Sequence, residues 1–300
     1  MRRIASKRRL FIQLYVVVVL LIVGGLLLNN LTVNLIRTGL GLDFSWLGRP
    51  AGFALGEAAL PYSPTNSYAR ALVAGWLNSL KVISIGLLLA TLLGVTAGAA
   101  RSSKNRLLRS FSGGYVALIR QVPLLLQLLF WYFVAFLSLP DTPVGGLIHF
   151  SNQGIRLLGL NLSVEFCAVL ISLVVFTGAS IAEIVRGGIN AVSQGQWEAF
   201  RSLGLSEGLG LRRIVLPQAL PTILPALTSQ YLNLAKNSTL AIAVGYADLY
   251  AVSDTTITQT GRAIEGFLLL LLSFLLLNLL ISSGMAFLNG IVLAKLRRSR

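Results

Sequence analysis

The chain alternates long apolar runs with shorter polar, basic or turn-rich stretches. Six such runs lie at residues 10–28, 73–100, 111–139, 162–184, 214–244 and 267–293. The first contains 19 residues, which as an α-helix would extend about 28 Å, close to the thickness of the hydrocarbon layer of a membrane. Backbone amides inside a bilayer need internal partners, so isolated spans of this length must be helical. The pattern predicts an all-α integral membrane protein with six transmembrane helices.

The first apolar run follows five basic residues, a feature that it shares with secretory signal peptides. It is long for a signal peptide, and Asn29 and Asn30 do not form a small-residue cleavage site. We therefore interpret it as a retained helix, with a cleaved leader as the alternative. This divides the chain into a basic segment with the first helix (1–29), a turn-rich extramembrane segment (30–70), a transmembrane domain (71–294) and a basic tail (295–300).

The basic residues are unevenly distributed between the two sides of the six-helix arrangement. Seventeen of the 25 Lys and Arg residues lie at the N-terminus, in the stretches 101–109 and 185–213, and at the C-terminus. Five lie on the other side, and Lys81, Arg120 and Lys236 lie within the spans or at their edges. Cytoplasmic loops of membrane proteins carry the excess of Lys and Arg. The distribution predicts that both termini and the 185–213 loop of this multi-pass membrane protein are cytoplasmic.

Composition excludes several other classes of protein. Hydrophobic residues make up 55% of the chain and charged residues 12%, against about 25% charged in a soluble domain. One cysteine, Cys167, and one histidine, His149, exclude a disulfide scaffold and a His-rich metal site. The net charge of +15 flanks the membrane spans, so we expect no nucleic-acid partner. The sequence has no G-x-x-x-x-G-K-[ST], H-E-x-x-H or G-x-S-x-G motif, and we do not expect an enzyme.

The most informative stretch lies in the predicted cytoplasmic loop. It has the spacing Glu-Ala-x4-Gly-x9-Ile-x-Leu-Pro, formed by Glu198, Ala199, Gly204, Ile214, Leu216 and Pro217. Trp197, Phe200 and Leu203 follow one another at three-residue intervals, which predicts an apolar stripe on a short helix that ends at Gly204. An exposed apolar stripe in a polar loop predicts a partner protein, and contact with lipid headgroups is the alternative.

This spacing resembles the cytoplasmic loop of permease subunits of ATP-binding-cassette (ABC) importers, apart from Phe200, where the family has alanine. In that family the loop forms a coupling helix that docks on a separate ATPase subunit. Three further stretches are similar to motifs of the polar amino acid uptake (His/Glu/Gln/Arg/opine) subfamily. These are Phe176–Ile189, with the pattern A-E-x-x-R-G-G, Arg120–Gln127 and Lys236–Leu240. The resemblance covers residues 70–292, so the first helix is an addition to the permease core.

The span after the coupling loop departs from the family pattern. Prolines stand at 217, 221 and 225, and relatives commonly have a basic residue at the second of these positions. Each proline removes a backbone donor, so this segment is predicted to be kinked and partly unwound.

Polar side chains inside the spans are candidates for the substrate pathway, because they are costly in lipid and usually face a cavity. Glu183 and Arg186 are one helical turn apart and match the two charges of an amino acid. Their alternative role is an ion pair that braces the helix. The remaining candidates are Lys236 and Asn237, with Gln127 and Thr177 as hydrogen-bonding wall.

The resemblance implies a transport function and a set of partners. We expect a non-enzymatic pore subunit for amino acids, with no cofactor of its own and with ATP and Mg²⁺ bound by a partner ATPase dimer. The other expected partners are a second permease chain, identical or paralogous, a periplasmic or lipid-anchored amino-acid-binding protein, and membrane lipid. The alternatives are an importer of another small polar solute, a transport-inactive scaffold or sensor, and a gated channel.

Overall fold

The computed structural model describes residues 2–37, 41–138, 142–144, 148–151, 154–157 and 160–298. Residue 139, the predicted end of the third span, and residues 299–300 of the predicted tail lie outside these ranges. The chain divides into two compact units, Met1–Ser45 and Trp46–Arg300. The first unit contains one long helix, α1 (Arg2–Arg37), whose stretch Gln13–Asn34 is long and apolar enough to cross a membrane.

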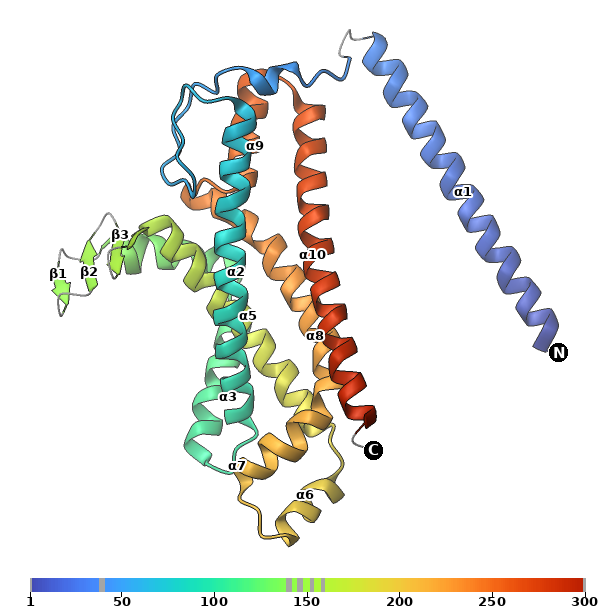
Figure 1. Ribbon diagram of the computed structural model, residues 1–300, viewed down its shortest axis with the longest axis vertical. Helices are drawn as coiled ribbons and strands as arrows, with labels where there is room; N and C mark the ends of the chain where they lie inside the picture. Colours follow the sequence, from blue (N-terminus) through green and yellow to red (C-terminus); the bar gives the residue numbers. More distant parts are fainter. Residues whose placement is uncertain are drawn as a thin grey trace. The chain divides into compact units, whose positions relative to one another are not determined.

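The second unit is a bundle of helices with short irregular turns and a small sheet (Figure 1). Its α-helices are α2 (Tyr68–Arg101), α3 (Arg106–Gln121), α4 (Leu124–Leu129), α5 (Val164–Asn190), α6 (Gln194–Ser202), α7 (Glu207–Gly210), α8 (Leu216–Asn237), α9 (Leu249–Thr260) and α10 (Ala263–Arg298). The π-helical turns are η2 (Phe130–Phe136) and η3 (Leu211–Val215), and the 3-10 turns are η1 (Ser45–Gly48) and η4 (Ser238–Val244).

Several of these helices satisfy the requirements for a membrane span. In the described part of the chain, α1, α2, α5 and α10 are long and apolar enough, and α3 with the helical stretch Leu124–Phe136 forms a bent pair that qualifies as a fifth. The protein is therefore a multi-pass membrane protein. Helix α8, the predicted fifth of six spans, is not among these helices.

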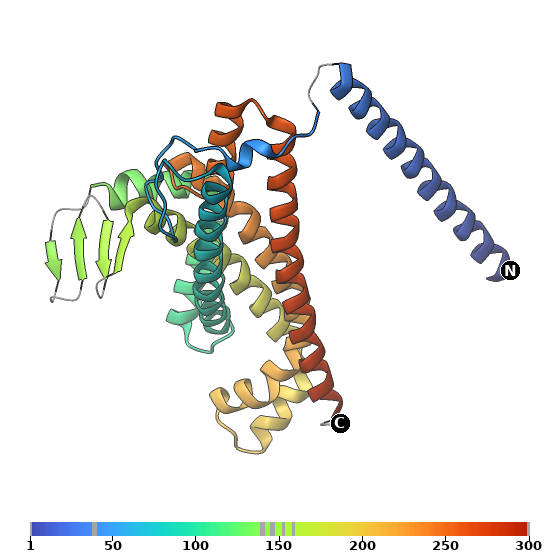
Figure 2. The same ribbon diagram turned by 45° about the horizontal axis from the view of Figure 1, so that its top comes forward.

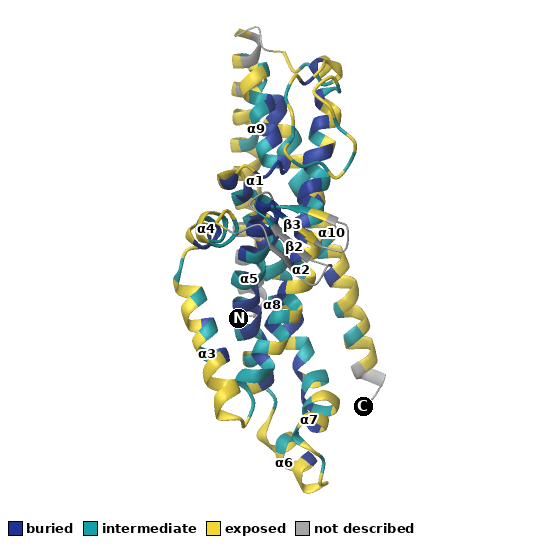
Figure 3. Cartoon of the chain, turned by 90° about the vertical axis from the view of Figure 1, so that its left-hand side faces the viewer, coloured by how far each residue is buried: buried dark blue, intermediate teal, exposed yellow. Residues whose placement is uncertain are grey.

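The core of the bundle is the contact between α2 and α5. Gly94 and Gly98 of α2 lie directly against α5, and a Cβ atom built on Gly94 would be 2.5 Å from the Cβ of Ile181. Buried residues follow α5 along most of its length, whereas α3 is largely exposed (Figure 3). Since lipid supplies no hydrophobic drive between helices, this close approach of two backbones provides the van der Waals contact that holds them together.

The predicted third span, 111–139, is interrupted near Pro123 and consists of two helical stretches at an angle to each other. Val122 is extended (φ −97°, ψ 127°), and the axes on either side of the break differ by 104°. Proline has no N–H and disfavours helical geometry in the residue before it. The side chain of Gln127 compensates for the break, because its Nε2 donates hydrogen bonds to the carbonyls of Ile119 and Val122, both at 2.9 Å.

The structure is mostly helical but not purely so, because the region between η2 and α5, which the sequence suggests is a loop, contains an antiparallel sheet. The strands are β1 (Thr142–Val144), β2 (Ile148–Ser151), β3 (Gly154–Leu157) and β4 (Leu160–Ser163), in the order β1-β2-β3-β4 (Figure 2). Apolar residues alternate with other residues at Ile148 and Phe150, the period expected of a strand. Strands of three or four residues make this signal weak, which is why the sequence reads as a loop.

Helix α8 is less irregular than its prolines predict. It is helical through Pro221 and Pro225, so partial unwinding around the prolines is wrong. Pro217 stands in the first turn, where its missing N–H removes no intrahelical bond. The irregular geometry lies at the ends instead, in the π-helical turn η3 before the helix and the 3-10 turn η4 after it.

We predict that Gly94→Ala destabilises the bundle, because the new methyl group meets Ile181 and the carbonyl of Gly178. Overpacking of this kind costs about 1–3 kcal/mol. The measurement is the midpoint of thermal unfolding in detergent. Gly113→Ala in α3 is the matched control, because nothing lies within 4 Å of its added Cβ, and alanine favours a helix over glycine by roughly 0.5–1 kcal/mol. Equal midpoints for the two variants would contradict the α2–α5 packing described here.

Candidate functional site

The predicted coupling loop forms the short helix α6, which ends as its sequence indicates. Gly204 adopts a left-handed conformation, with φ +71°, which terminates the helix without strain. The predicted apolar stripe is only partly exposed, however. Leu203 is 75% exposed, Trp197 is half-buried and Phe200 is fully buried. An exposed stripe that includes Phe200 is therefore wrong.

Phe200 is buried because α7 folds back over α6. Its ring lies against Gly210, so closely that a Cβ atom on that residue would overlap it. Helix α6 therefore exposes Glu198 and Ala199 rather than the complete aromatic stripe, with Leu203 exposed just beyond its last turn. Ile214, Leu216 and Pro217 are half-buried at the start of the segment that continues into α8. The burial of Phe200 depends on a glycine ten residues later, which a helical spacing rule does not detect.

Charged residues connect the α6–α7 region to the turn between α2 and α3. Glu207 accepts a hydrogen bond from Arg201 Nε at 2.9 Å, and Lys104 Nζ lies 2.5 Å from the same carboxylate oxygen. These two cations lower the pKa of Glu207 to about 2, with the hydrogen bond from Arg201 as the largest cause. Glu207 is therefore ionised at neutral pH and links α7 electrostatically to Arg201 of α6 and to Lys104 in the turn between α2 and α3.

Glu183 and Arg186 form an ion pair within α5, as expected if their role is to brace the helix. Arg186 Nε donates a hydrogen bond to Glu183 Oε1 at 3.1 Å. Arg101, in the last turn of α2, also donates to the other oxygen of Glu183. The carboxylate is thus already neutralised by two guanidinium groups from two helices, which favours a bracing role over contact with substrate.

The other predicted pathway residues do not form one cluster. Gln127 is buried at the break after α3, and Thr177 is buried in the middle of α5. Lys236 is exposed and Asn237 is half-buried at the end of α8. Gln127 donates its amide protons to the broken helix and so has a structural role there; its role as pathway wall stays a prediction.

A row of exposed residues along α8 is a feature that the sequence analysis missed. The row follows the helix at intervals of three and four residues, so its members share one face. Its members are Gln218, Thr222, Pro225, Ser229, Asn233 and Lys236. We call this row the α8 polar face. The three- and four-residue spacing of these positions is visible in the sequence. However, buried residues such as Ala219, Ile223 and Leu227 lie between them, so the stretch as a whole is recognised only as an apolar run.

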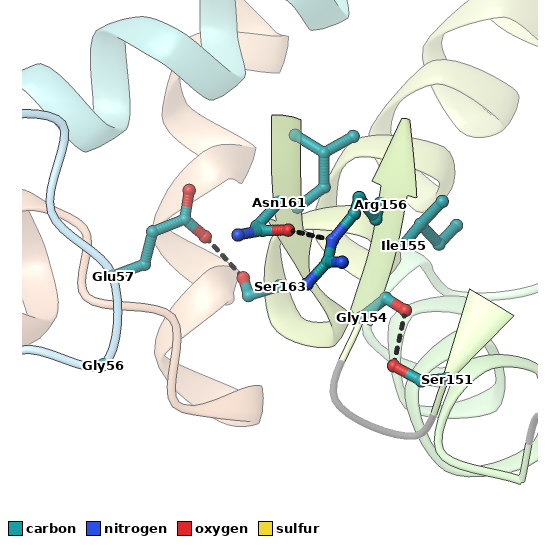
Figure 4. A pocket seen from close by; sticks show the side chains of 9 residues that line it. Gly56, Glu57, Ser151, Gly154, Ile155, Arg156, Asn161 and Ser163 are labelled. Atoms are coloured by element: carbon teal, nitrogen blue, oxygen red, sulfur yellow. Dashed lines mark hydrogen bonds between the residues drawn. The ribbon is translucent and has the colours of Figure 1, made fainter. Parts of the chain in front are cut away.

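A second missed group joins residues far apart in the sequence. Glu57, in the segment before α2, forms an ion pair with Lys81 of α2, and Ser163 Oγ donates a hydrogen bond to Glu57 Oε2 at 2.5 Å. Glu57, Ser163 and Arg156 line a cavity of about 370 Å³ between this segment and the strands β3 and β4 (Figure 4). No local motif in the sequence connects Glu57 with these partners.

Comparison with known proteins identifies the family. Residues 90–290 match the family described as binding-protein-dependent transport system inner membrane component. The chain is also 35% identical to the putative amino-acid ABC transporter permease protein YhdX of Escherichia coli K12, over 91% of each chain. The chain belongs to this family of ABC transporter permeases.

Two further likenesses agree with this assignment. The permease is 32% identical to the general L-amino acid transport system permease protein AapQ of Rhizobium johnstonii, over 94% of this chain and 92% of that one. A solved amino acid ABC transporter with histidines superposes with a TM-score of 0.58 at 28% identity, covering 74% of the permease and 94% of that chain. The methionine transporter MetNI, at 20% identity, has a TM-score of 0.59 over 74% of the permease and 96% of its own chain, and shows the fold alone.

The ion-pair geometry predicts how substitutions around Glu183 behave. Glu183→Gln leaves Arg101 and Arg186 without their shared carboxylate, so it should lower the thermal midpoint more than Arg186→Gln does. The double variant Glu183→Gln with Arg186→Gln should recover part of the loss, because one unpaired cation remains instead of two. The midpoint of thermal unfolding and the rate of uptake are measured for the parent protein, the two single variants and the double variant. If the double variant unfolds at the expected midpoint but transports no better than either single variant, bracing alone does not explain the loss of transport. That result would instead support contact of these side chains with the substrate.

Proposed function

We propose that this permease carries amino acids across the bacterial inner membrane, driven by ATP hydrolysis on separate subunits. Several of its relatives are permeases whose names refer to amino acids, general L-amino acids or glutamate and glutamine. A zwitterionic solute needs a polar route through the lipid, and the α8 polar face offers one. This face is the observation that carries the proposal.

The α8 polar face is hard to accommodate in lipid. Ser229, Asn233 and Lys236 are exposed along a helix whose other face packs in the bundle core. Polar side chains in a membrane bundle face protein or a water-filled cavity, because lipid gives them no hydrogen-bond partner. In the proposal this face is turned towards a second permease chain, identical or paralogous, and the route for the substrate lies between them.

The arrangement across the membrane follows from α8 and from the basic residues. In the proposal α8 is a sixth span, beside the bent pair and the four apolar helices. The excess of Lys and Arg supports a cytoplasmic location for both termini and the α6–α7 region. The segment before α2 and the four-stranded sheet then lie on the outer side, where a periplasmic or lipid-anchored binding protein would deliver the substrate.

The α6–α7 region is the proposed contact with the ATPase. Leu203 and the exposed residues Glu198 and Ala199 provide a small docking surface. Phe200 beneath Gly210 fixes α6 to α7, so that movement of the docked helix passes into η3 and α8. ATP and Mg²⁺ would be bound by the ATPase dimer, and this chain supplies the coupling surface and the pathway.

A role as an importer of another small polar solute uses the same pathway, and a transport-inactive scaffold or sensor uses the same fold. ATPase activity of the reconstituted complex separates these functions. An amino acid importer responds to binding protein loaded with amino acid and accumulates that amino acid in vesicles. A scaffold shows neither response.

The first test replaces polar side chains of the α8 polar face by leucine. Thr222→Leu with Ser229→Leu should reduce ATP-driven amino acid uptake at least about tenfold, the effect of 1.4 kcal/mol on a rate. Thr96→Leu, the matched control, makes the same kind of change at an exposed position of α2 whose hydroxyl bonds its own helix. It should leave uptake within about twofold of the parent protein. Equal effects of the two changes would contradict a pathway along α8.

The second test concerns the docking surface. Glu198→Arg with Leu203→Asp should leave the permease in the membrane but uncouple it, because an apolar contact is lost and a charge is reversed at exposed positions. The expected result is loss of the ATPase subunits on purification, or ATP hydrolysis without uptake. Arg106→Glu, a charge reversal at another exposed position on the same side, is the control. Normal ATP-driven uptake by the Glu198→Arg, Leu203→Asp variant would refute the coupling assignment.

A further inference from the structure

Residues 46–67, which begin in the turn η1 and continue without further helix, lie outside the part of the chain matched to the permease family. We call this stretch the outer segment. It packs on the first turns of α2 and α9: Trp46 and Ala51 are buried in a cluster with Tyr68 of α2 and Val252 of α9. The ring of Trp46 meets that of Tyr68 edge-on, with the centroids 5.7 Å apart. The segment is therefore attached to the bundle and is not a free loop.

Asn78, fully buried in α2, fixes the middle of the outer segment. Its Nδ2 donates hydrogen bonds to the carbonyls of Glu57 and Ala247, both at 2.8 Å, and its Oδ1 accepts one from Ala59 N at 2.9 Å. The same amide thus binds the outer segment and the connection that leads into α9.

The side chain of Glu57 adds a second attachment next to the first. Its carboxylate pairs with Lys81, one turn after Asn78 on α2, and accepts a hydrogen bond from Ser163 at the start of α5. The ammonium of Lys81 also lies over the ring of Phe166, 4.2 Å from its centroid. The side chains of Glu57 and Lys81 are 17% and 29% exposed, so water screens this pair less than it screens surface pairs.

The outer segment lies next to the end of the proposed pathway. Phe53, Ala54, Leu55 and Gly56 form one side of a cavity of about 320 Å³. The other side comes from η4 and α9, including Ile242, Ala251 and Thr255. Because η4 directly continues α8, this cavity adjoins the outer end of the α8 polar face.

We propose that Glu57 is a positioning residue that holds the outer segment as a cover over η4 and α9, at the outer mouth of the pathway. The location of the mouth rests on the proposed function. The attachment itself rests only on the contacts of Glu57 and Asn78. Release of the Glu57–Lys81 pair uncovers α9, and substrate enters past the displaced segment.

Arg70 provides a matched comparison, because it also attaches the outer segment to α2. Its Nε and Nη2 donate hydrogen bonds to the carbonyl of Pro61, at 3.1 and 2.8 Å. This attachment lies on the exposed side of the segment and does not involve α5. If any attachment were sufficient, loss of Arg70 and loss of Glu57 would have the same effect.

The experiment measures access to the cavity by a membrane-impermeant maleimide, using the complete permease–ATPase complex in proteoliposomes. Thr255→Cys places a thiol in the cavity wall, and the single native cysteine, Cys167, is buried and gives the background rate. Adding Glu57→Gln should accelerate labelling of Cys at 255 at least about fivefold, as expected for loss of a charge-assisted interaction. Adding Arg70→Met should change the rate by less than about twofold. The double exchange Glu57→Lys with Lys81→Glu should return the rate towards that of the parent.

Thr258→Cys, at an exposed position of α9, controls for general loosening and should label equally in every background. Unchanged labelling at 255 in Glu57→Gln, or equal acceleration by Arg70→Met, overturns the proposal. Where Glu57→Gln alone does not assemble, Glu57→Gln with Lys81→Gln removes both charges and must show the same acceleration. The labelling requires neither substrate nor uptake, so failure of the cover is distinguishable from failure of the proposed transport function. If the cover is correct, Glu57→Gln also raises ATP hydrolysis in the absence of binding protein without lowering the amount of assembled complex.

Discussion

The close contact of α2 with α5 is the constraint on which the rest of the bundle depends. Gly94 and Gly98 bring two backbones together, α8 and α10 share an apolar core with this pair, and α3 and α8 each add a polar contact to it. Tyr115 of α3 donates a hydrogen bond to the carbonyl of Val175 in α5, at 2.7 Å, and the hydroxyl of Thr91 in α2 lies 2.6 Å from that of Tyr231 in α8. The α2–α5 pair is therefore the frame on which the other helices of the bundle pack.

The sequence predicted the spans well where length alone identifies them, and less well where the backbone is interrupted. Helices α2, α5 and α10 correspond to apolar runs because the bilayer imposes both length and composition on such helices. The bend at Pro123 was not predicted, since apolarity continues on both sides of it. Whether a proline kinks or breaks a helix depends on partners such as Gln127, which replaces the lost backbone contacts through its side chain. The sheet was missed because its strands are shorter than the window in which alternation can be recognised.

The candidate site shows the same division between local and distant information. The end of α6 at Gly204 follows from a local rule, and the backbone conformation agrees with it. The charges of Glu183 and Arg186 were identified, but Arg101, 82 residues away from Glu183, decides that the carboxylate is already paired. Glu57 was not identified at all, because its partners Lys81 and Ser163 come from two other elements. Local patterns identify the charged residues in the chain. Only the packing of the helices determines which of them are already paired within the protein and which could contact a substrate.

The burial of Phe200 beneath Gly210 has a consequence for how this permease diverges from its relatives. The ring of Phe200 occupies the space that a side chain at position 210 would fill. The two positions share one volume, so an enlargement at one site is tolerated only with a reduction at the other. Substitutions at residues 200 and 210 are therefore expected to be epistatic: a side chain larger than glycine at 210 is tolerated only when the ring at 200 is made smaller.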